Sequence, residues 1–239
     1  MARDVVLLHG FTHTGASWDP VVAALGESYR ALALDIPGHG SASDRSPVTL
    51  EGVVEDLNTL APKQFTLVGY SMGGRIALHA ALALPGRIER LILIGASPGI
   101  ADAAEREARL DDDERLAVKI EGMSIEEFAR QWGHTPVLAG QPPDVLAAAH
   151  ADRLRNRPAG LARALRGLGT AALPSLWGRL GEIRVPVALV VGERDEKFRE
   201  VAARMAPEVP DSELIVVPDA GHAVHLEAPD AVAAAIAAV

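Results

Sequence analysis

The chain of 239 residues contains no cysteine. This absence excludes disulfides, thiolate catalysis and cysteine-ligated zinc, and it is compatible with folding in a reducing compartment. Aromatic residues make up only 4% of the chain, whereas hydrophobic residues as a whole make up 49%. We therefore expect a large core that is built mainly from alanine, valine, leucine and isoleucine.

Long hydrophobic runs and an excess of basic residues are also missing. No stretch approaches the roughly 18–20 uncharged apolar residues of a spanning helix, so we expect no membrane span. The formal net charge is −9, which argues against binding to nucleic acid. Arg3 and Asp4 lead straight into an apolar run instead of a signal sequence. We therefore expect a cytoplasmic protein, as a monomer or weak oligomer.

Short apolar runs alternate with helix-compatible segments along much of the chain. The runs that we predict to be strands cover residues 5–9, 31–35, 65–68, 91–95, 187–192 and 214–217. Such alternation is typical of an α/β fold, with a mainly parallel sheet flanked by helices on both faces. Functional side chains are then expected at the carboxyl ends of the strands, where the loops converge.

The region between the fourth and fifth predicted strands is too long for a simple crossover. It shows no strand pattern and contains amphipathic or charged segments at residues 103–120, 124–132, 144–155 and 159–168. We predict that residues 98–173 form a helical cap inserted over the strand ends. The remaining core domain would then consist of residues 1–97 and 174–239.

The most informative motif is Gly69-Tyr70-Ser71-Met72-Gly73, which stands between a predicted strand and a helical segment. This is the G-x-S-x-G nucleophile elbow in the strand–turn–helix setting that the motif requires. The turn is so tight that side chains two positions before and after the serine would collide, which explains both glycines. The motif predicts that the Ser71 hydroxyl projects above the sheet as a reactive group.

A reactive serine needs a histidine to take its proton and a carboxylate to orient that histidine. In chains with this elbow the order is serine, then acid, then histidine. Asp195 follows the fifth predicted strand and His222 follows the sixth. We therefore predict a triad of Ser71, Asp195 and His222, with His222 as the base.

Alternatives to this triad remain open from the sequence. Glu193 or Asp219 could serve as the acid, and His225 could replace His222 as the base. Metal ligation is not indicated, because the H-E-x-x-H pattern is absent and the remaining histidines show no ligand spacing. We therefore expect a site without a metal ion.

Negative charge that develops on an oxygen near Ser71 would need backbone N–H donors to stabilise it. In the elbow architecture, one donor comes from the residue after the nucleophile, and the other comes from the loop after an early strand. These donors are expected to be the amides of Met72 and of Phe11, the latter in the run His9-Gly10-Phe11.

At a larger scale, nearly the whole chain resembles the α/β-hydrolase superfamily, through His9-Gly-Phe11, the loop at 35–40, the elbow and Gly221-His222. Two further features make the resemblance more specific. They are Arg75 after the elbow and the string Gly-Glu-Arg-Asp-Glu-Lys-Phe at residues 192–198. Together these features resemble the 2-succinyl-6-hydroxy-2,4-cyclohexadiene-1-carboxylate synthase family of menaquinone biosynthesis. One departure is Gly-Thr-Ala-Ala-Leu-Pro at 169–174, where members often have a Gly-Gln-Pro form.

The resemblance implies a lyase that needs no cofactor. The triad would abstract a proton from 2-succinyl-5-enolpyruvyl-6-hydroxy-3-cyclohexene-1-carboxylate, and pyruvate would leave by 2,5-elimination. Arginines suit such a small-molecule tricarboxylate, because their planar forks bind carboxylates through two bonds. The implied substrate-binding residues are Tyr70, Arg75, Arg109, Trp132 and Arg155.

Two other classes of function share this pattern. A carboxylesterase or a C–C bond hydrolase would use the same triad with Ser71 as a covalent nucleophile. A receptor or binding protein on the same fold would bind a small carboxylate without turnover.

Overall fold

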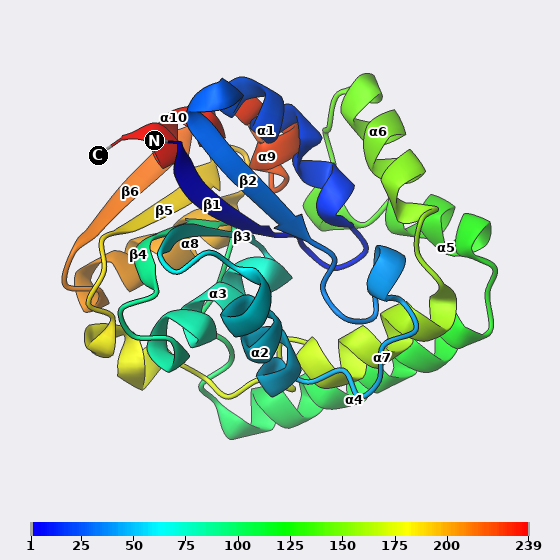
Figure 1. The fold of residues 1–239 in the computed structure, drawn as a ribbon. Helices are drawn as coiled ribbons and strands as arrows, with labels where there is room; N and C mark the ends of the chain where they lie inside the picture. Colours follow the sequence, from blue (N-terminus) through cyan, green and yellow to red (C-terminus); the bar gives the residue numbers. More distant parts are fainter. Residues whose placement is uncertain (1, 239) are drawn as a thin grey trace.

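The computed structural model describes residues 2–238 (Figure 1). Six strands form one sheet in the order β2-β1-β3-β4-β5-β6, and every neighbouring pair is parallel. The strands are β1 (Arg3–Leu8), β2 (Tyr29–Leu34), β3 (Phe65–Tyr70), β4 (Ile88–Ile94), β5 (Val187–Gly192) and β6 (Ser212–Val217). The parallel α/β architecture predicted from the alternating pattern is confirmed, and each predicted strand matches an observed one to within a few residues.

The α-helices lie between and around these strands. They are α1 (Asp19–Leu25), α2 (Leu50–Leu60), α3 (Met72–Ala83), α4 (Ala103–Glu121), α5 (Ile125–Trp132), α6 (Pro143–Arg153), α7 (Pro158–Leu168), α8 (Glu196–Met205), α9 (Val224–Glu227) and α10 (Pro229–Ala237). None of the helices within residues 2–238 combines the length and the apolar character needed to cross a membrane.

Helices cover both faces of the sheet, because successive strand side chains point to opposite faces. On β1, Val6 and Leu8 belong to a core cluster that also contains buried residues of α2, α3 and α8. Val5 and Leu7 belong to a second cluster, which is completed by residues of α1, α9 and α10. Burial on both faces explains why the strands read as continuous apolar runs rather than as alternating ones.

The chain between β4 and β5 contains helices α4 to α7 and no strand among the described residues. Helices α4, α5 and α7 share a small core that is separate from the two sheet clusters, formed by Ala117, Ile120, Phe128, Leu161, Ala162 and Leu165. In Figure 1 these green helices lie on the side toward which the β1 and β2 arrows point. The segment is helical as expected, and its limits at 98 and 173 stay a prediction.

Helix α7 is joined to the core by direct backbone contact. A Cβ on Gly160 would lie 2.6 Å from the Gly38 carbonyl oxygen, and one on Gly167 would lie 1.9 Å from the Val48 carbonyl oxygen. Only glycine therefore permits this helix to approach the loops that follow β2. The approach fixes the height of α7 above the strand ends.

A larger side chain at Gly167 should push α7 away from the core. We expect Gly167→Val to lower the free energy of unfolding by about 1–3 kcal/mol, as overpacking does elsewhere. Urea unfolding followed by circular dichroism measures this change. Gly178→Val is the matched control, because nothing lies within 4 Å of a Cβ at Gly178. Equal unfolding midpoints for Gly167→Val and the unmodified chain would contradict the close contact.

Candidate active site

The turn between β3 and α3 places Ser71 in a strained conformation. Its φ is 50° and its ψ is −108°, a region that residues with a side chain adopt at a cost of about 1–3 kcal/mol. A Cβ on Gly69 would lie 2.4 Å from the Gly73 carbonyl oxygen, and one on Gly73 would lie 2.2 Å from the Leu8 carbonyl oxygen. The two glycines thus let α3 pack directly against β3 and β1, and this packing maintains the strain at Ser71.

Ser71, His222 and Asp195 form a continuous chain of hydrogen bonds. His222 Nε2 lies 3.2 Å from Ser71 Oγ, and His222 Nδ1 lies 2.6 Å from Asp195 Oδ2. His222 is 6% exposed and Asp195 is 8% exposed, so water competes little for these bonds. A carboxylate on Nδ1 leaves Nε2 available to take the serine proton, as the triad chemistry requires.

Aromatic rings hold the His222 imidazole in place. The Phe198 ring centre lies 4.5 Å from that of His222, and the Tyr70 ring centre lies 5.2 Å from it. Gly95 contributes by its small size, because a Cβ there would lie 2.9 Å from His222 Nδ1. Tyr70, which the sequence assigned to substrate contact, is buried and packs behind the imidazole.

Glu227 stabilises the loop that carries His222, a role that the sequence analysis did not identify. Its carboxylate accepts hydrogen bonds from the Gly221 amide at 2.8 Å and from the Ala223 amide at 3.2 Å, on either side of His222. It also pairs with Arg194 at 2.9 Å. No local motif marks this role, because it depends on how a short helix folds back over the preceding loop.

The alternative triad members have other partners. Glu193 accepts a hydrogen bond from the Asp219 amide at 3.1 Å, so these two residues meet each other instead of His222. His225 is fully buried, and within residues 2–238 neither of its ring nitrogens has a hydrogen-bond partner. Its ring centre lies 4.2 Å from that of Tyr70. It therefore sits behind Tyr70 rather than beside Ser71.

The expected oxyanion donors stand at two converging backbone segments. Met72 is the first residue of α3, and the first amides of a helix have no partner within it. Phe11 lies in the loop after β1, where its ring meets that of Trp132 edge-on at a centre distance of 5.3 Å. Trp132 ends α5, so the helical region reaches the loop that carries the Phe11 amide.

Arg75 is buried one turn into α3 and lies on the same side of the helix as Ser71. It is 7% exposed and donates from Nη1 to the Leu168 carbonyl oxygen at 3.3 Å. Its Nε has no hydrogen-bond partner within residues 2–238. Burial, with a smaller contribution from nearby Arg109, lowers the pKa of Arg75 to about 10, although Asp113 partly opposes the shift. A buried cation with unused donors can bind an anion strongly.

Arg109 and Asp113 face this cation from α4. Arg109 Nε donates to Asp113 Oδ1 at 2.7 Å, while Asp113 Oδ2 is buried without a partner among residues 2–238. Burial raises the pKa of Asp113, and its bond with Arg109 and the charge of Arg75 counteract this increase. The structure thus brings two of the predicted arginines together around one carboxylate.

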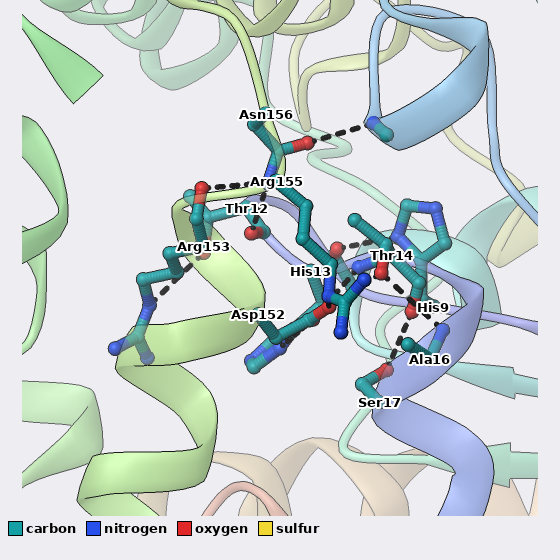
Figure 2. A network of polar contacts seen from close by, with 12 residues as sticks. His9, Thr12, His13, Thr14, Ala16, Ser17, Asp152, Arg153, Arg155 and Asn156 are labelled. Atoms are coloured by element: carbon teal, nitrogen blue, oxygen red, sulfur yellow. Dashed lines mark hydrogen bonds and ion pairs between the residues drawn. The ribbon is translucent and has the colours of Figure 1, made fainter. Parts of the chain in front are cut away.

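Arg155 is placed differently from this pair. Its side chain is 64% exposed, and its Nε lies 3.8 Å from Asp152 Oδ1. Arg153, two residues earlier, is 1% exposed. Its Nε donates to Thr12 Oγ1 at 3.4 Å. Burial lowers the pKa of Arg153, and Tyr70 and Asp152 only partly offset this shift. Figure 2 shows the two arginine side chains diverging. The buried arginine on this helix is therefore Arg153, which the sequence analysis did not select.

No group of three or more His, Cys, Asp or Glu side chains in residues 2–238 is arranged to hold a metal ion. A serine, an imidazole and a carboxylate in sequence can move a proton, or can activate the serine as a nucleophile. Buried arginines beside them favour an anionic ligand.

The fold agrees with comparisons to known proteins. A family profile described as "Alpha/beta hydrolase family" matches residues 5–235. The chain belongs to the α/β hydrolase family, as the elbow and the other motifs of its sequence predicted.

Within that family the similarity is more specific. A 2-succinyl-6-hydroxy-2,4-cyclohexadiene-1-carboxylate synthase from Enterobacter sp. (strain 638) is 34% identical, and the match covers 98% of this chain and 90% of the relative. A Bacillus subtilis (strain 168) protein that provisionally bears the same name is 37% identical, over 94% of this chain and 85% of its own. The solved structure of MenH from S. aureus has a TM-score of 0.91 and 32% identity, over 98% of this chain and 92% of its own. The chain therefore belongs with these synthases, which confirms the resemblance drawn from its motifs.

Four histidines near the site are buried in ways that oppose their protonation. Burial lowers the pKa of each, to about 4 for His9, where hydrogen bonding to Gly10 partly offsets it. The other three are His13, His39 and His225. Their rings form part of an aromatic group that surrounds the β1 loop and Tyr70.

These histidines predict loss of stability in mild acid. Below the unfolded pKa of 6.5 the unfolded chain takes up protons, while the buried imidazoles stay neutral until the pH approaches their lower folded pKa values. Stability is then full above about pH 7 and falls as the pH drops toward 4, by up to about 1.4 kcal/mol per pH unit for each histidine. Urea unfolding at pH 7.5, 6 and 5 measures the slope. His225→Phe should flatten it and exposed His134→Gln should not, whereas equal stability at pH 7.5 and 5 would contradict the prediction.

Proposed function

We propose that this chain is a carbon–oxygen lyase that eliminates pyruvate from 2-succinyl-5-enolpyruvyl-6-hydroxy-3-cyclohexene-1-carboxylate to give 2-succinyl-6-hydroxy-2,4-cyclohexadiene-1-carboxylate. The observation that carries the proposal is the Asp195–His222–Ser71 hydrogen-bond chain with buried Arg75 one turn further along α3. Membership of the synthase family supports the choice of substrate. The substrate carries three carboxylates, and the site offers arginines for them.

The proposed reaction begins with removal of the proton α to the succinyl ketone. Ser71 Oγ takes this proton and passes its own to His222 Nε2, along the 3.2 Å contact. The electrons of the C–H bond form an enolate, whose oxygen the Phe11 and Met72 amides would stabilise. Collapse of the enolate breaks the C–O bond to the enolpyruvyl group. The leaving enolate then takes up a proton and becomes pyruvate.

Substrate binding would fall to two buried arginines, Arg75 and Arg153, and to the partly exposed Arg109. Arg75 and Arg109 lie around Asp113, so an incoming carboxylate would find two cations with one protein counter-charge. We assign the third arginine as Arg153 rather than Arg155, because Arg153 is buried near Tyr70. Trp132, in edge contact with Phe11, would form an apolar wall. A cytoplasmic monomer or weak oligomer is the form that we propose.

An ester hydrolase is the second candidate, because the structural similarity extends to esterases. A thermophilic esterase from Thermogutta terrifontis, solved with malate bound, has a TM-score of 0.86 and 26% identity, over 99% of this chain and 89% of its own. In an esterase Ser71 would become acylated, whereas in the proposed elimination it would not. Mass spectrometry of enzyme quenched during turnover of the enolpyruvyl substrate distinguishes them. An adduct on Ser71 would favour the hydrolase mechanism.

Replacing the serine should stop pyruvate release. We expect Ser71→Ala to reduce kcat at least about 10³-fold, because the triad acts as one unit, and Asp195→Asn or His222→Ala should add little to that loss. Incubation with the enolpyruvyl substrate and an assay for pyruvate measures this. Exposed Ser28→Ala is the control. Normal pyruvate release by Ser71→Ala would remove Ser71 from the mechanism.

Replacing Arg153 at the end of α6 and Arg155 just after it should have unequal effects. We expect Arg153→Ala to lower kcat/KM by about 10–100-fold, because a charge-assisted hydrogen bond contributes roughly 1.5–3 kcal/mol. Arg155→Ala should change it by less than about threefold, since an exposed ion pair contributes little. Thermal unfolding checks that both variants fold. Equal losses in the two variants would restore Arg155 as a substrate contact.

A further inference from the structure

The end of α6 makes most of the side-chain hydrogen bonds to the loop that follows β1. This loop, residues 11–15, carries the Phe11 amide and lies about 140 positions from α6 in sequence. Figure 2 shows Asp152, Arg153 and Asn156 converging on residues 12–14. The mechanism above uses none of the contacts made by Asp152 and Asn156.

Asp152 binds two successive residues of the loop. One carboxylate oxygen accepts a hydrogen bond from the Thr14 amide at 2.9 Å and another from His13 Nδ1 at 3.1 Å. The other oxygen accepts from the Thr14 hydroxyl. Burial alone would raise the pKa of Asp152, but these hydrogen bonds lower it to about 2. The carboxylate is therefore charged at neutral pH, and it satisfies donors that would otherwise be buried without partners.

Asn156 binds the residue next to Phe11. Its amide nitrogen donates to the Thr12 carbonyl oxygen at 2.8 Å, and its amide oxygen accepts from the Gly40 amide at 3.0 Å. One side chain therefore joins the loop after β1 to the loop after β2. Thr12 itself has a φ of 73°, a conformation that a residue with a branched side chain keeps only when its surroundings impose it.

The core provides fewer constraints on the same loop. The Gly15 amide donates to Asp35 at 2.7 Å, and the His13 amide donates to the Gly10 carbonyl oxygen at 3.2 Å. Thr14 also accepts hydrogen bonds from the Ala16 amide at 3.3 Å and from the Ser17 hydroxyl at 2.8 Å, whereas the remaining side-chain hydrogen bonds of residues 12–14 come from α6 and the residues just after it. The Phe11 amide is therefore placed from the helical region as well as from the sheet.

We propose that Asp152 and Asn156 are positioning residues that hold the Phe11 amide where it stabilises the enolate, an inference that rests on the proposed function. They act through residues 12–14 and do not touch the substrate. Small displacements of catalytic groups reduce rates strongly, by about 100-fold for a shift near 1 Å. The end of α6 and the residues just after it would thus contribute to the chemical step by holding the loop that carries the Phe11 amide.

The test compares kcat with KM in four variants of the full chain. Asp152→Ala and Asn156→Ala should each lower kcat by about 10–100-fold and change KM by less than about threefold. Asp152→Asn keeps an acceptor for the Thr14 amide, so it should retain more activity than Asp152→Ala. Asp144→Asn, at the exposed start of α6, should behave as the unmodified enzyme. Amide hydrogen exchange at Phe11, measured by NMR, should become faster in the first two variants only.

Each outcome decides a separate question. Unchanged kcat in both alanine variants, or a rise in KM alone, would overturn the positioning role. If Asp152→Ala does not fold, Asn156→Ala and Asp152→Asn decide it. If the unmodified enzyme releases no pyruvate, the proposed function fails, and the exchange rates then judge the loop alone. Faster exchange at Phe11 would keep the anchoring role, whereas unchanged exchange would remove it too.

Discussion

The close passage of α3 beneath the ends of β1 and β3 is the constraint on which the site depends. Gly73 lies where any Cβ would meet the Leu8 carbonyl oxygen at 2.2 Å, so only glycine lets the helix pack this closely against the sheet. That contact fixes Ser71 in its left-handed conformation, and it aligns the first amide of α3 with the loop after β1. The histidine and the acid then need only reach one fixed point, from the loops after β6 and β5.

Burial shapes the electrostatics of the same region in two opposite ways. Histidines around the β1 loop lose affinity for protons, so they act as polar packing rather than as charges. Arginines cannot give up their charge so easily, and Arg75 keeps a pKa of about 10 despite its burial. In a chain with a net charge of −9, the result is a local cationic site. Because burial has already removed water from these cations, an anion that enters the site does not have to displace it.

The sequence predicted the sheet and the elbow well, because both depend on neighbours in the chain. Apolar runs and a glycine–serine–glycine turn are local patterns, and strand ends of a parallel sheet meet at one edge. It selected Arg155 and not Arg153, because the two side chains differ in burial near the end of α6 and only packing shows which one is buried. Glu227 and Asp152 were missed for a similar reason. Their partners depend on the folding back of one loop and on a contact across about 140 positions.

The rigid first turn of α3 has a consequence for which molecules the site accepts. Ser71 caps the N-terminus of α3, and its carbonyl oxygen accepts a hydrogen bond from the Arg75 amide at 3.1 Å, so about four residues of helical rise, roughly 6 Å along the axis, separate the two. No loop intervenes that could lengthen or shorten this span. Helix α3 therefore sets the distance between two points on the substrate: the carbon that loses its proton to Ser71 and the carboxylate that binds Arg75. Homologous acids with one methylene more or less between these two points would be out of register, whatever their affinity for the rest of the pocket.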